Sequence, residues 1–203
     1  MTSWCRTGGS RKAVAAEPNI RLVAPNAVKS VEYGASHVTG HLADGSTVKA
    51  KVCLACDGRG PPTRNAAGIK TVGWSYNQTG IVCTVEHELP HEGVAQEYFL
   101  PGGPFAILPM VGNRSSLVWT ERTANAKAIL SLNDEDFTEE MRERFGDYLG
   151  DCAPVGPRWS YPLTLQLSRE YVRPRLALVA DAAHGVHPIA GQGLNLGLRD
   201  VAA

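Results

Sequence analysis

The sequence lacks a surplus of charge of either sign. Lys and Arg number 20 and Asp and Glu also number 20, so the formal net charge is zero at pH 7. Binding nucleic acid through its phosphates requires a basic surplus, so we expect no nucleic-acid partner. Long hydrophobic runs are also missing, since no apolar stretch reaches the ~20 residues of a membrane-spanning helix. No secretory apolar segment is present either, so we expect a cytoplasmic protein and leave membrane association open.

Cysteines are few and odd in number, because the chain has five. An odd count in an intracellular chain argues against a disulfide framework. Cys53 and Cys56 form a C-x-x-C pair, which raises a metal or redox interpretation. The pair lies in an apolar run typical of a strand, where positions three apart point to opposite faces. No second C-x-x-C follows, so we expect no metal site.

The N-terminal part of the chain reads as short strands followed by a helix. Apolar and alternating segments predict strands at 20–24 and 28–33. Asp44-Gly45, between two alternating segments, is a strong hairpin signal. The second arm of this hairpin runs into the continuous apolar stretch 52–55, as in a strand that is buried on both faces. Residues 61–68 are expected to form a helix, with proline at its start and glycine at its end.

The middle of the chain is rich in strands. Four strand-like segments between residues 72 and 121 are separated by short turns, which predicts an antiparallel sheet. Residues 134–149 predict an amphipathic helix in which Asp134 caps the start and Gly150 ends it. Further strands are expected at 159–168 and 175–181.

Two of the expected strands, 52–56 and 176–180, each lead directly into an aspartate, Asp57 and Asp181. Ligands of α/β sheets bind at the carboxyl ends of the strands. We therefore expect both aspartates at a ligand site.

A glycine-rich segment follows Asp181 and is expected to open a helix between Gly191 and Gly193. The first amides of a helix have no internal acceptor, and glycine lets a ligand approach the main chain closely. The positive end of the helix dipole favours electron-rich oxygens. Together with the carboxylate of Asp181, these features suit a ligand with a polyol and a flat, electron-accepting head.

The segment HPIAGQGLNLGLRD, residues 187–200, resembles the motif of flavin-dependent aromatic hydroxylases of the ubiquinone-biosynthesis group. These enzymes belong to the p-hydroxybenzoate hydroxylase-like family. Residues 181–184 are similar to the family's Gly-Asp motif, and ACDGRGPPTR at 55–64 to its Asp-Gly motif. The stretches 73–80, 99–110 and 115–121 also resemble this group, so the resemblance covers roughly residues 52–203.

The resemblance implies a fold of the α+β or α/β class: a partial FAD-binding, Rossmann-like domain with an inserted antiparallel-sheet substrate domain. We expect residues 1–71 to be the partial FAD-binding domain and residues 72–172 the substrate-type sheet domain. Residues 173–203 would return to the FAD-binding domain and be truncated in its helix.

The resemblance also implies roles for individual residues. Asp181 would bind the ribityl chain of FAD, and Pro188 would line the cavity of flavin and substrate. Asp57, Gly58 and Arg64 match a motif that the family associates with FAD and with the reduced nicotinamide cofactor. No catalytic residue is assigned. The main chain would contact the pyrimidine end of the isoalloxazine at Gly191, Gln192, Gly193, Leu194 and Asn195.

The chemistry implied by the resemblance is that of an FAD-dependent monooxygenase. Such an enzyme uses NAD(P)H and O2 to hydroxylate a polyprenylated phenol in ubiquinone biosynthesis. Its partner would be an aromatic, lipid-tailed small molecule, and peripheral membrane contact or a biosynthetic complex stays open. Two alternatives are another flavin oxidoreductase of the superfamily, such as a reductase or halogenase, and a truncated, non-catalytic fragment.

The sequence departs from the family pattern in three ways. Ala180 stands where the family usually has glycine, and Pro61 stands where serine is common. No G-x-G-x-x-G follows an initial strand, although this fingerprint holds the FAD pyrophosphate. The resemblance places it before residue 1, so we expect an internal fragment of a larger enzyme that holds FAD poorly by itself. Each missing charge-assisted hydrogen bond costs ~1.5–3 kcal/mol.

Two of the named residues also have simpler interpretations, and two histidines raise a further possibility. Asp57 has the alternative role of capping the helix that follows it, and Arg64 that of a surface residue of the same helix. His184 and His187 invite a metal-binding or acid–base role, but no acidic or thiol partner has matching spacing. The resemblance makes these two histidines cavity residues.

Overall fold

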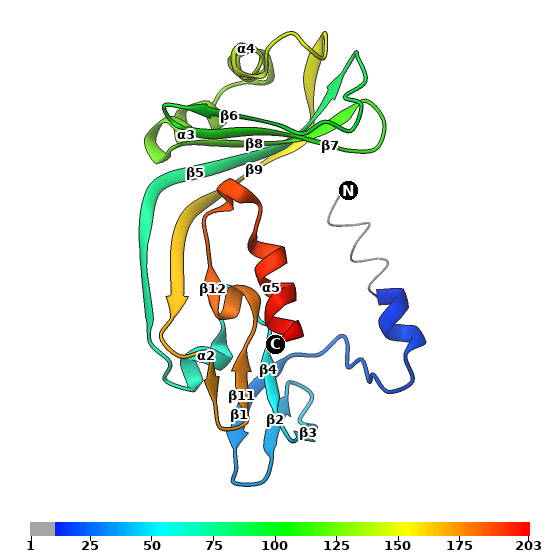
Figure 1. Ribbon diagram of the computed structural model, residues 1–203, viewed down its shortest axis with the longest axis vertical. Coiled ribbons are helices and arrows are strands. Elements are labelled where there is room, and N and C mark those ends of the chain that lie inside the picture. The colour runs from blue at the N-terminus through cyan, green and yellow to red at the C-terminus, as the bar shows by residue number, and fades with distance from the viewer. Residues whose placement is uncertain (1–10) are drawn as a thin grey trace. The chain divides into compact units, whose positions relative to one another are not determined.

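The computed structural model describes residues 11–203 and divides them into two compact units (Figure 1). One unit contains residues 75–163 together with 11–18, and the other contains 19–74 and 164–203. Residues 1–10, which our domain prediction includes, lie outside the described part. Two long strands, β5 (Thr71–His87) and β9 (Cys152–Ser168), run through both units.

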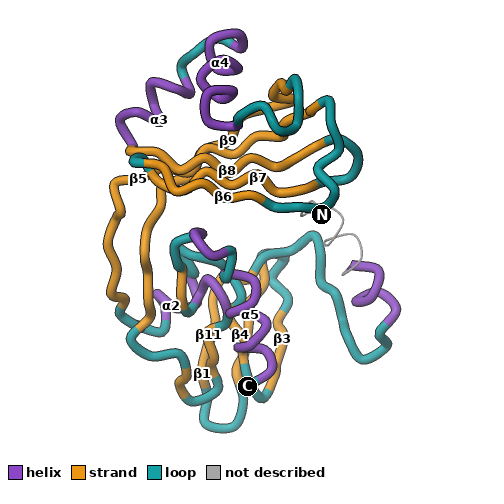
Figure 2. Tube along the Cα trace, turned by 45° about the horizontal axis from the view of Figure 1, so that its top comes forward, coloured by secondary structure: helices purple, strands orange, loops and turns teal. Residues whose placement is uncertain are grey.

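The first unit is built on a sheet whose strands lie in the order β9-β5-β8-β7-β6 (Figure 2). β6 comprises Gln96–Leu100, β7 Gly103–Pro109 and β8 Arg114–Arg122. The pairs β5–β8, β8–β7 and β7–β6 are antiparallel. The four strand segments expected between residues 72 and 121 are therefore confirmed, whereas β9 begins seven residues earlier than the predicted start at 159.

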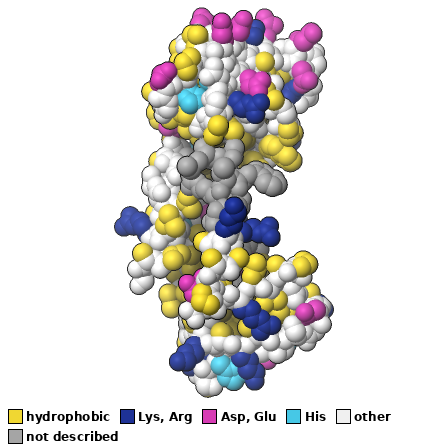
Figure 3. All heavy atoms as spheres, turned by 90° about the vertical axis from the view of Figure 1, so that its right-hand side faces the viewer, with side chains coloured by type: hydrophobic (Ala, Val, Ile, Leu, Met, Phe, Trp, Pro, Cys, Tyr) yellow, Lys and Arg dark blue, Asp and Glu magenta, His cyan; other side chains and the backbone are white. Residues whose placement is uncertain are grey.

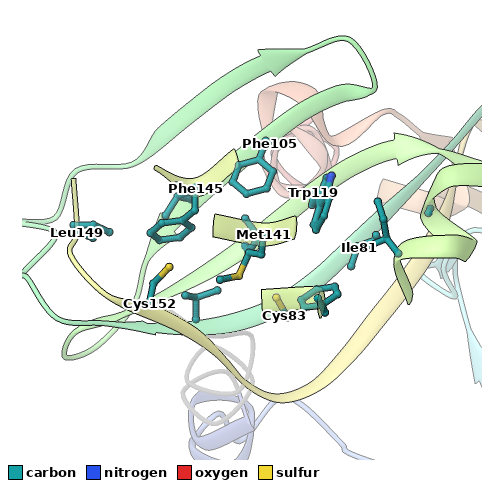
Figure 4. Packing of buried hydrophobic residues seen from close by; sticks show 14 residues of the cluster. Ile81, Cys83, Phe105, Trp119, Met141, Phe145, Leu149 and Cys152 are labelled. Atoms are coloured by element: carbon teal, nitrogen blue, oxygen red, sulfur yellow. The ribbon is translucent and has the colours of Figure 1, made fainter. Parts of the chain in front are cut away.

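Two helices, α3 (Thr123–Leu130) and α4 (Asp134–Phe145), pack their apolar residues against one face of this sheet. Trp119 lies at the centre, with its ring 5.7 Å from that of Phe105 in an edge-to-face arrangement and 5.9 Å from that of Phe137 (Figure 4). Alternate residues in the central parts of β5 and β8 are buried, because side chains of a strand alternate between faces. The labelled residues of Figure 4 come from four strands, from α4 and from the segment after it: Ile81, Cys83, Phe105, Trp119, Met141, Phe145, Leu149 and Cys152.

Helix α4 is shorter than the predicted 134–149 at its C-terminus. Its first turn is capped by Asn133, whose side chain accepts a hydrogen bond from the Asp136 amide, rather than by Asp134. Gly146 ends the helix, because its φ of 76° lies in a region that glycine adopts without strain. Acidic side chains gather on the end of the unit formed by α4 (Figure 3), and the first turn, with its positive dipole end, has three of them.

The second unit contains a three-stranded antiparallel sheet of β1 (Val28–Tyr33), β2 (Val38–Leu42) and β3 (Thr47–Ala50). The hairpin predicted at Asp44-Gly45 is confirmed, with Asp44 accepting hydrogen bonds from the amide and hydroxyl of Ser46. The strand predicted at 20–24 is wrong. Ile20 and Leu22 are half exposed or more, and this segment pairs with no strand among the described residues.

A second small sheet of this unit has the order β10-β11-β4, with β10 at Val172–Arg173, β11 at Leu176–Leu178 and β4 at Cys53–Ala55. β4 and β11 are parallel. The prediction that residues 52–55 are buried on both faces is wrong, because Val52 and Leu54 are 50% and 60% exposed. The chain then forms helix α2 (Pro62–Ala66), which begins at a proline as expected.

The C-terminal segment completes the second unit. A short 3-10 turn, η1 (Ala180–Ala182), follows β11, and β12 (His184–Gly185) pairs with the end of β9. A second 3-10 turn, η2 (Pro188–Ala190), precedes helix α5 (Gly193–Ala202), which begins where the sequence predicts. No helix within residues 11–203 has the length and apolarity that crossing a membrane requires.

Candidate functional site

The parallel pairing of β4 with β11 brings Asp57 and Asp181 to the same edge of a sheet. Leu176 is in register with Cys53 and Leu178 with Ala55. The Val179 amide continues the ladder by donating to the Ala55 carbonyl at 3.0 Å. Because both strands run in the same direction, both aspartates follow the carboxyl ends of neighbouring strands, where ligands of α/β sheets bind.

Asp181 lies in η1, and its carboxylate is 46% exposed. Its Oδ2 atom is 3.5 Å from Nε of Arg59. The Arg59 guanidinium is held from the other side, since Nη2 donates to the Val186 carbonyl at 2.7 Å. Nothing in the spacing of Arg59 marks this role, and the sequence does not predict it. Asp181 is therefore oriented by a cation yet keeps part of its surface open to a ligand.

Asp57 serves as the cap of α2. Its Oδ2 atom accepts hydrogen bonds from the amide and the hydroxyl of Thr63, at 3.2 and 2.7 Å. The simpler interpretation of this residue is thus realised in the structure. Gly58 follows with a φ of 82°, which a side chain would disfavour. Asp57, together with residues of β1, β4 and α2, lines a cavity of about 360 Å³ within this unit.

Arg64 is buried, with 5% of its surface exposed, so its interpretation as a surface residue is wrong. Nη1 donates to the Ala182 carbonyl at 3.3 Å and Nη2 to the Arg59 carbonyl at 3.4 Å. Its Nε atom is buried and has no hydrogen-bond partner among residues 11–203. Arg64 thus connects α2 with the turn that carries Asp181, and brings the two motifs of the sequence together.

The start of α5 presents open main-chain amides. The Leu196 amide donates to the Gln192 carbonyl at 2.9 Å, which is the first bond of the helix. Within the described chain, no hydrogen bond leaves the amides of Gln192, Gly193, Leu194 and Asn195. The Gly191 amide differs, because it donates to the Pro188 carbonyl at 2.8 Å. Four of the five residues expected at the flavin thus have a free amide, and Gly191 contributes a left-handed turn with a φ of 59°.

The glycines of this segment have open surroundings. A Cβ atom added at Gly191 or at Gly193 would meet no atom within 4 Å. Pro188, Gln192 and Asn195 are exposed, and Leu194 is 52% exposed. A planar group with carbonyl oxygens fits this surface, because the amides would donate to those oxygens and the positive helix end would stabilise negative charge.

The two histidines of the segment have structural partners. His184 is buried, and its Nε2 atom is 2.7 Å from Oδ2 of Asp200. His187 accepts a hydrogen bond from the Ile189 amide at 3.1 Å and so caps η2. Burial, and secondly the nearby Arg59 cation, lower the pKa of His187. Among residues 11–203, no group of three metal-binding side chains is placed to hold an ion.

Ala180, which replaces the family's glycine, has a φ of 54°, in the left-handed region. Its methyl group faces Gly197 of α5, where an added Cβ would lie 2.7 Å from Cβ of Ala180. Glycine at 197 therefore provides the room that the methyl at 180 occupies.

A family model described as an FAD-binding domain matches residues 12–203. The chain belongs to the FAD-binding domain family. Its relatives include a protein named ubiquinone hydroxylase UbiL from Rhodospirillum rubrum, which is 55% identical over 185 residues covering 91% of this chain and 43% of the relative. A protein named 3-demethoxyubiquinol 3-hydroxylase from Escherichia coli is 34% identical, over 95% of this chain and 49% of the relative. The chain thus spans less than half the length of these two relatives.

Among solved structures, pqsL from Pseudomonas aeruginosa, described as a probable FAD-dependent monooxygenase, matches with a TM-score of 0.77 and 21% identity. The match covers 95% of this chain and 55% of that one. The expected fold class, a partial FAD-binding domain with an antiparallel-sheet insertion, is thereby confirmed.

Proposed function

We propose that residues 11–203 form part of an FAD-dependent monooxygenase that hydroxylates an aromatic small molecule. The observation that carries this proposal is the set of four free amides at the start of α5, next to open space and in the same unit as Asp181. The names of the relatives support a ubiquinone-type substrate with a lipid tail.

Each residue has a distinct task in this proposal. Asp181 accepts hydrogen bonds from the ribityl hydroxyls, with Arg59 fixing its orientation. The amides from Gln192 to Asn195 donate to the pyrimidine oxygens of the flavin, and Pro188 lines the cavity. Asp57, Gly58 and Arg64 shape the edge of the sheet on which both motifs meet. Bound FAD supplies the redox chemistry that activates O2, and the chain positions the ring and keeps water away from it.

Further parts of the proposal concern the whole enzyme. NAD(P)H is the electron donor, and residues 72–172 form the substrate-binding part inserted between two FAD-binding segments, 1–71 and 173–203. The lipid tail of the substrate would bring the enzyme to a membrane surface or into a biosynthetic complex from a cytoplasmic location. These assignments follow from the motif resemblance and from the kinship with ubiquinone-pathway hydroxylases.

Titration of the chain with FAD, followed by amide NMR shifts and flavin fluorescence, tests the proposal. We expect weak but saturable binding, because the 203 residues contain no pyrophosphate-binding G-x-G-x-x-G, and the largest shifts should occur from Gln192 to Asn195. Asp181→Ala should weaken binding about tenfold or more, the loss of one charge-assisted hydrogen bond. Glu32→Ala, which removes an exposed carboxylate of β1, serves as the control. Saturable binding that shifts other residues and ignores Asp181 would contradict the assignment.

A further inference from the structure

Asp200 is an acidic residue in the last turn of α5, where the negative end of the helix dipole disfavours a carboxylate. A carboxylate in this place requires compensation from specific donors. Two are present: the Ala180 amide and Nε2 of His184 both lie 2.7 Å from the same Oδ2 atom. The side chain of Asp200 is only 24% exposed, so these bonds are partly shielded from water.

The first of these bonds acts on the residue directly before Asp181. Ala180 has a left-handed φ of 54°, a conformation that an L-residue keeps only when its surroundings hold it. The direction in which the chain leaves β11, and hence the direction of the Asp181 carboxylate, depends on this conformation. Asp200 holds Ala180 in place through its amide.

The second bond fixes a buried ring. Nε2 of His184 lies within hydrogen-bond distance of the Asp200 carboxylate, and Nδ1 is buried without a hydrogen-bond partner among the described residues. The imidazole ring also lies 5.9 Å from that of Tyr171. Because the only hydrogen bond of the ring within the described chain is to Asp200, while the backbone of His184 pairs with β9, His184 anchors α5 to the strand that follows η1.

Asp200 therefore lies near the C-terminal end of α5, and the free amides lie at the N-terminal end of the same helix. Its carboxylate also accepts a hydrogen bond from the turn that carries Asp181. We propose that Asp200 is a positioning residue of the flavin site, which fixes the first turn of α5 relative to the Asp181 carboxylate. This inference rests on the proposed function. Gly197 assists, since its missing side chain allows the helix to approach Ala180.

A thermodynamic cycle on FAD affinity tests this role. Asp200→Ala should weaken FAD binding about tenfold in the wild-type background, but less than threefold when Asp181 is already Ala, because there is then no carboxylate left to position. Asp200→Asn retains one acceptor for the Ala180 amide, so its loss should be intermediate. Ile69→Val lowers stability in a buried cluster that includes Leu176 and Leu178 but no residue of α5, and it should leave affinity unchanged.

The outcomes separate the two proposals. If Asp200→Ala weakens FAD binding by the same factor with and without the Asp181 carboxylate, Asp200 does not act by positioning, and the inference fails while the flavin site stands. If the Ile69→Val control loses affinity as much as Asp200→Ala, the effect is one of general stability, and the inference fails as well. If FAD at millimolar concentration shifts no amide of the wild-type chain, both the proposed function and this inference fail.

Discussion

The contact between Ala180 and Gly197 predicts a pair of substitutions that compensate each other. Gly197→Ala places two methyl groups 2.7 Å apart, which requires a backbone shift, because neither carbon can rotate away. Such overpacking costs about 1–3 kcal/mol, while alanine inside a helix gains about 1 kcal/mol over glycine. We expect a net loss of about 1 kcal/mol in the free energy of unfolding.

Substitution of the other residue of the pair, Ala180, changes the sign of the effect on the free energy of unfolding. Ala180→Gly relieves about 1–2 kcal/mol of left-handed strain and gives back ~0.4–1 kcal/mol through a more flexible unfolded chain, so alone it is close to neutral or mildly stabilising. In the double variant the clash is absent, since the nearest remaining atom, Cα of residue 180, is 3.5 Å away. The double variant should therefore exceed the wild type by about 1–2 kcal/mol.

Urea unfolding, followed by circular dichroism, measures the stability of the wild type, the two single variants and the double variant. The urea midpoints are compared at a constant slope of the free energy of unfolding against urea concentration. Gly193→Ala is the matched control in the same helix, because its added Cβ meets nothing within 4 Å and should not couple to position 180. Equal stability of Gly197→Ala and the wild type would contradict this prediction, as would additive effects of the substitutions at positions 180 and 197.

Three other predictions concern pH, a buried cation and thiol reactivity. The pKa of His187 is lower in the folded than in the unfolded chain, so the unfolded chain binds more protons as pH falls below about 6.5 and stability is lost on acidification. His187→Asn still caps the turn and should flatten this pH dependence of stability, as measured by melting curves at several pH values. Arg64→Met removes two hydrogen bonds, each worth about 0.5–1.5 kcal/mol, although Ser168 and Gln166 still donate to the same two carbonyls; it should cost about 1–3 kcal/mol in urea unfolding, whereas a surface arginine would cost under ~0.5 kcal/mol. In a Cys5→Ser background, the exposed Cys56 should react with a thiol reagent at pH 8 before Cys83, whose pKa burial raises to about 11; equal rates would contradict the buried position of Cys83.

The elements that the sequence predicts well are those with a strong local signal. The hairpin at Asp44-Gly45, the strands between 72 and 121 and the start of α5 all depend on turn residues and alternation within a short window. The strand expected at 20–24 fails because an apolar run needs a pairing partner, which local sequence does not reveal.

The residues of the candidate site likewise fall into those that local sequence predicts and those that it does not. Free amides at the start of α5 follow from helix geometry, so local sequence suffices to expect them. The roles of Arg59, Arg64 and Asp200 depend on contacts between residues more than a hundred positions apart, or across a turn of unusual conformation. For Asp200 the sequence offers one indication, because a carboxylate at the C-terminal end of a helix is disfavoured by the helix dipole and requires a specific partner.

The parallel pairing of β4 with β11 has a consequence for the order in which this chain acquires its structure. Residues 75–163 form a continuous segment between the two strands, so their contacts can arise while the C-terminal strand is still unmade. The edge that carries both aspartates cannot form until β11 has been synthesised, and closing so long a loop comes late in folding. Nascent chains arrested before β11 should therefore present β4 as an unpaired edge, which makes this short strand the point most exposed to mispairing during synthesis.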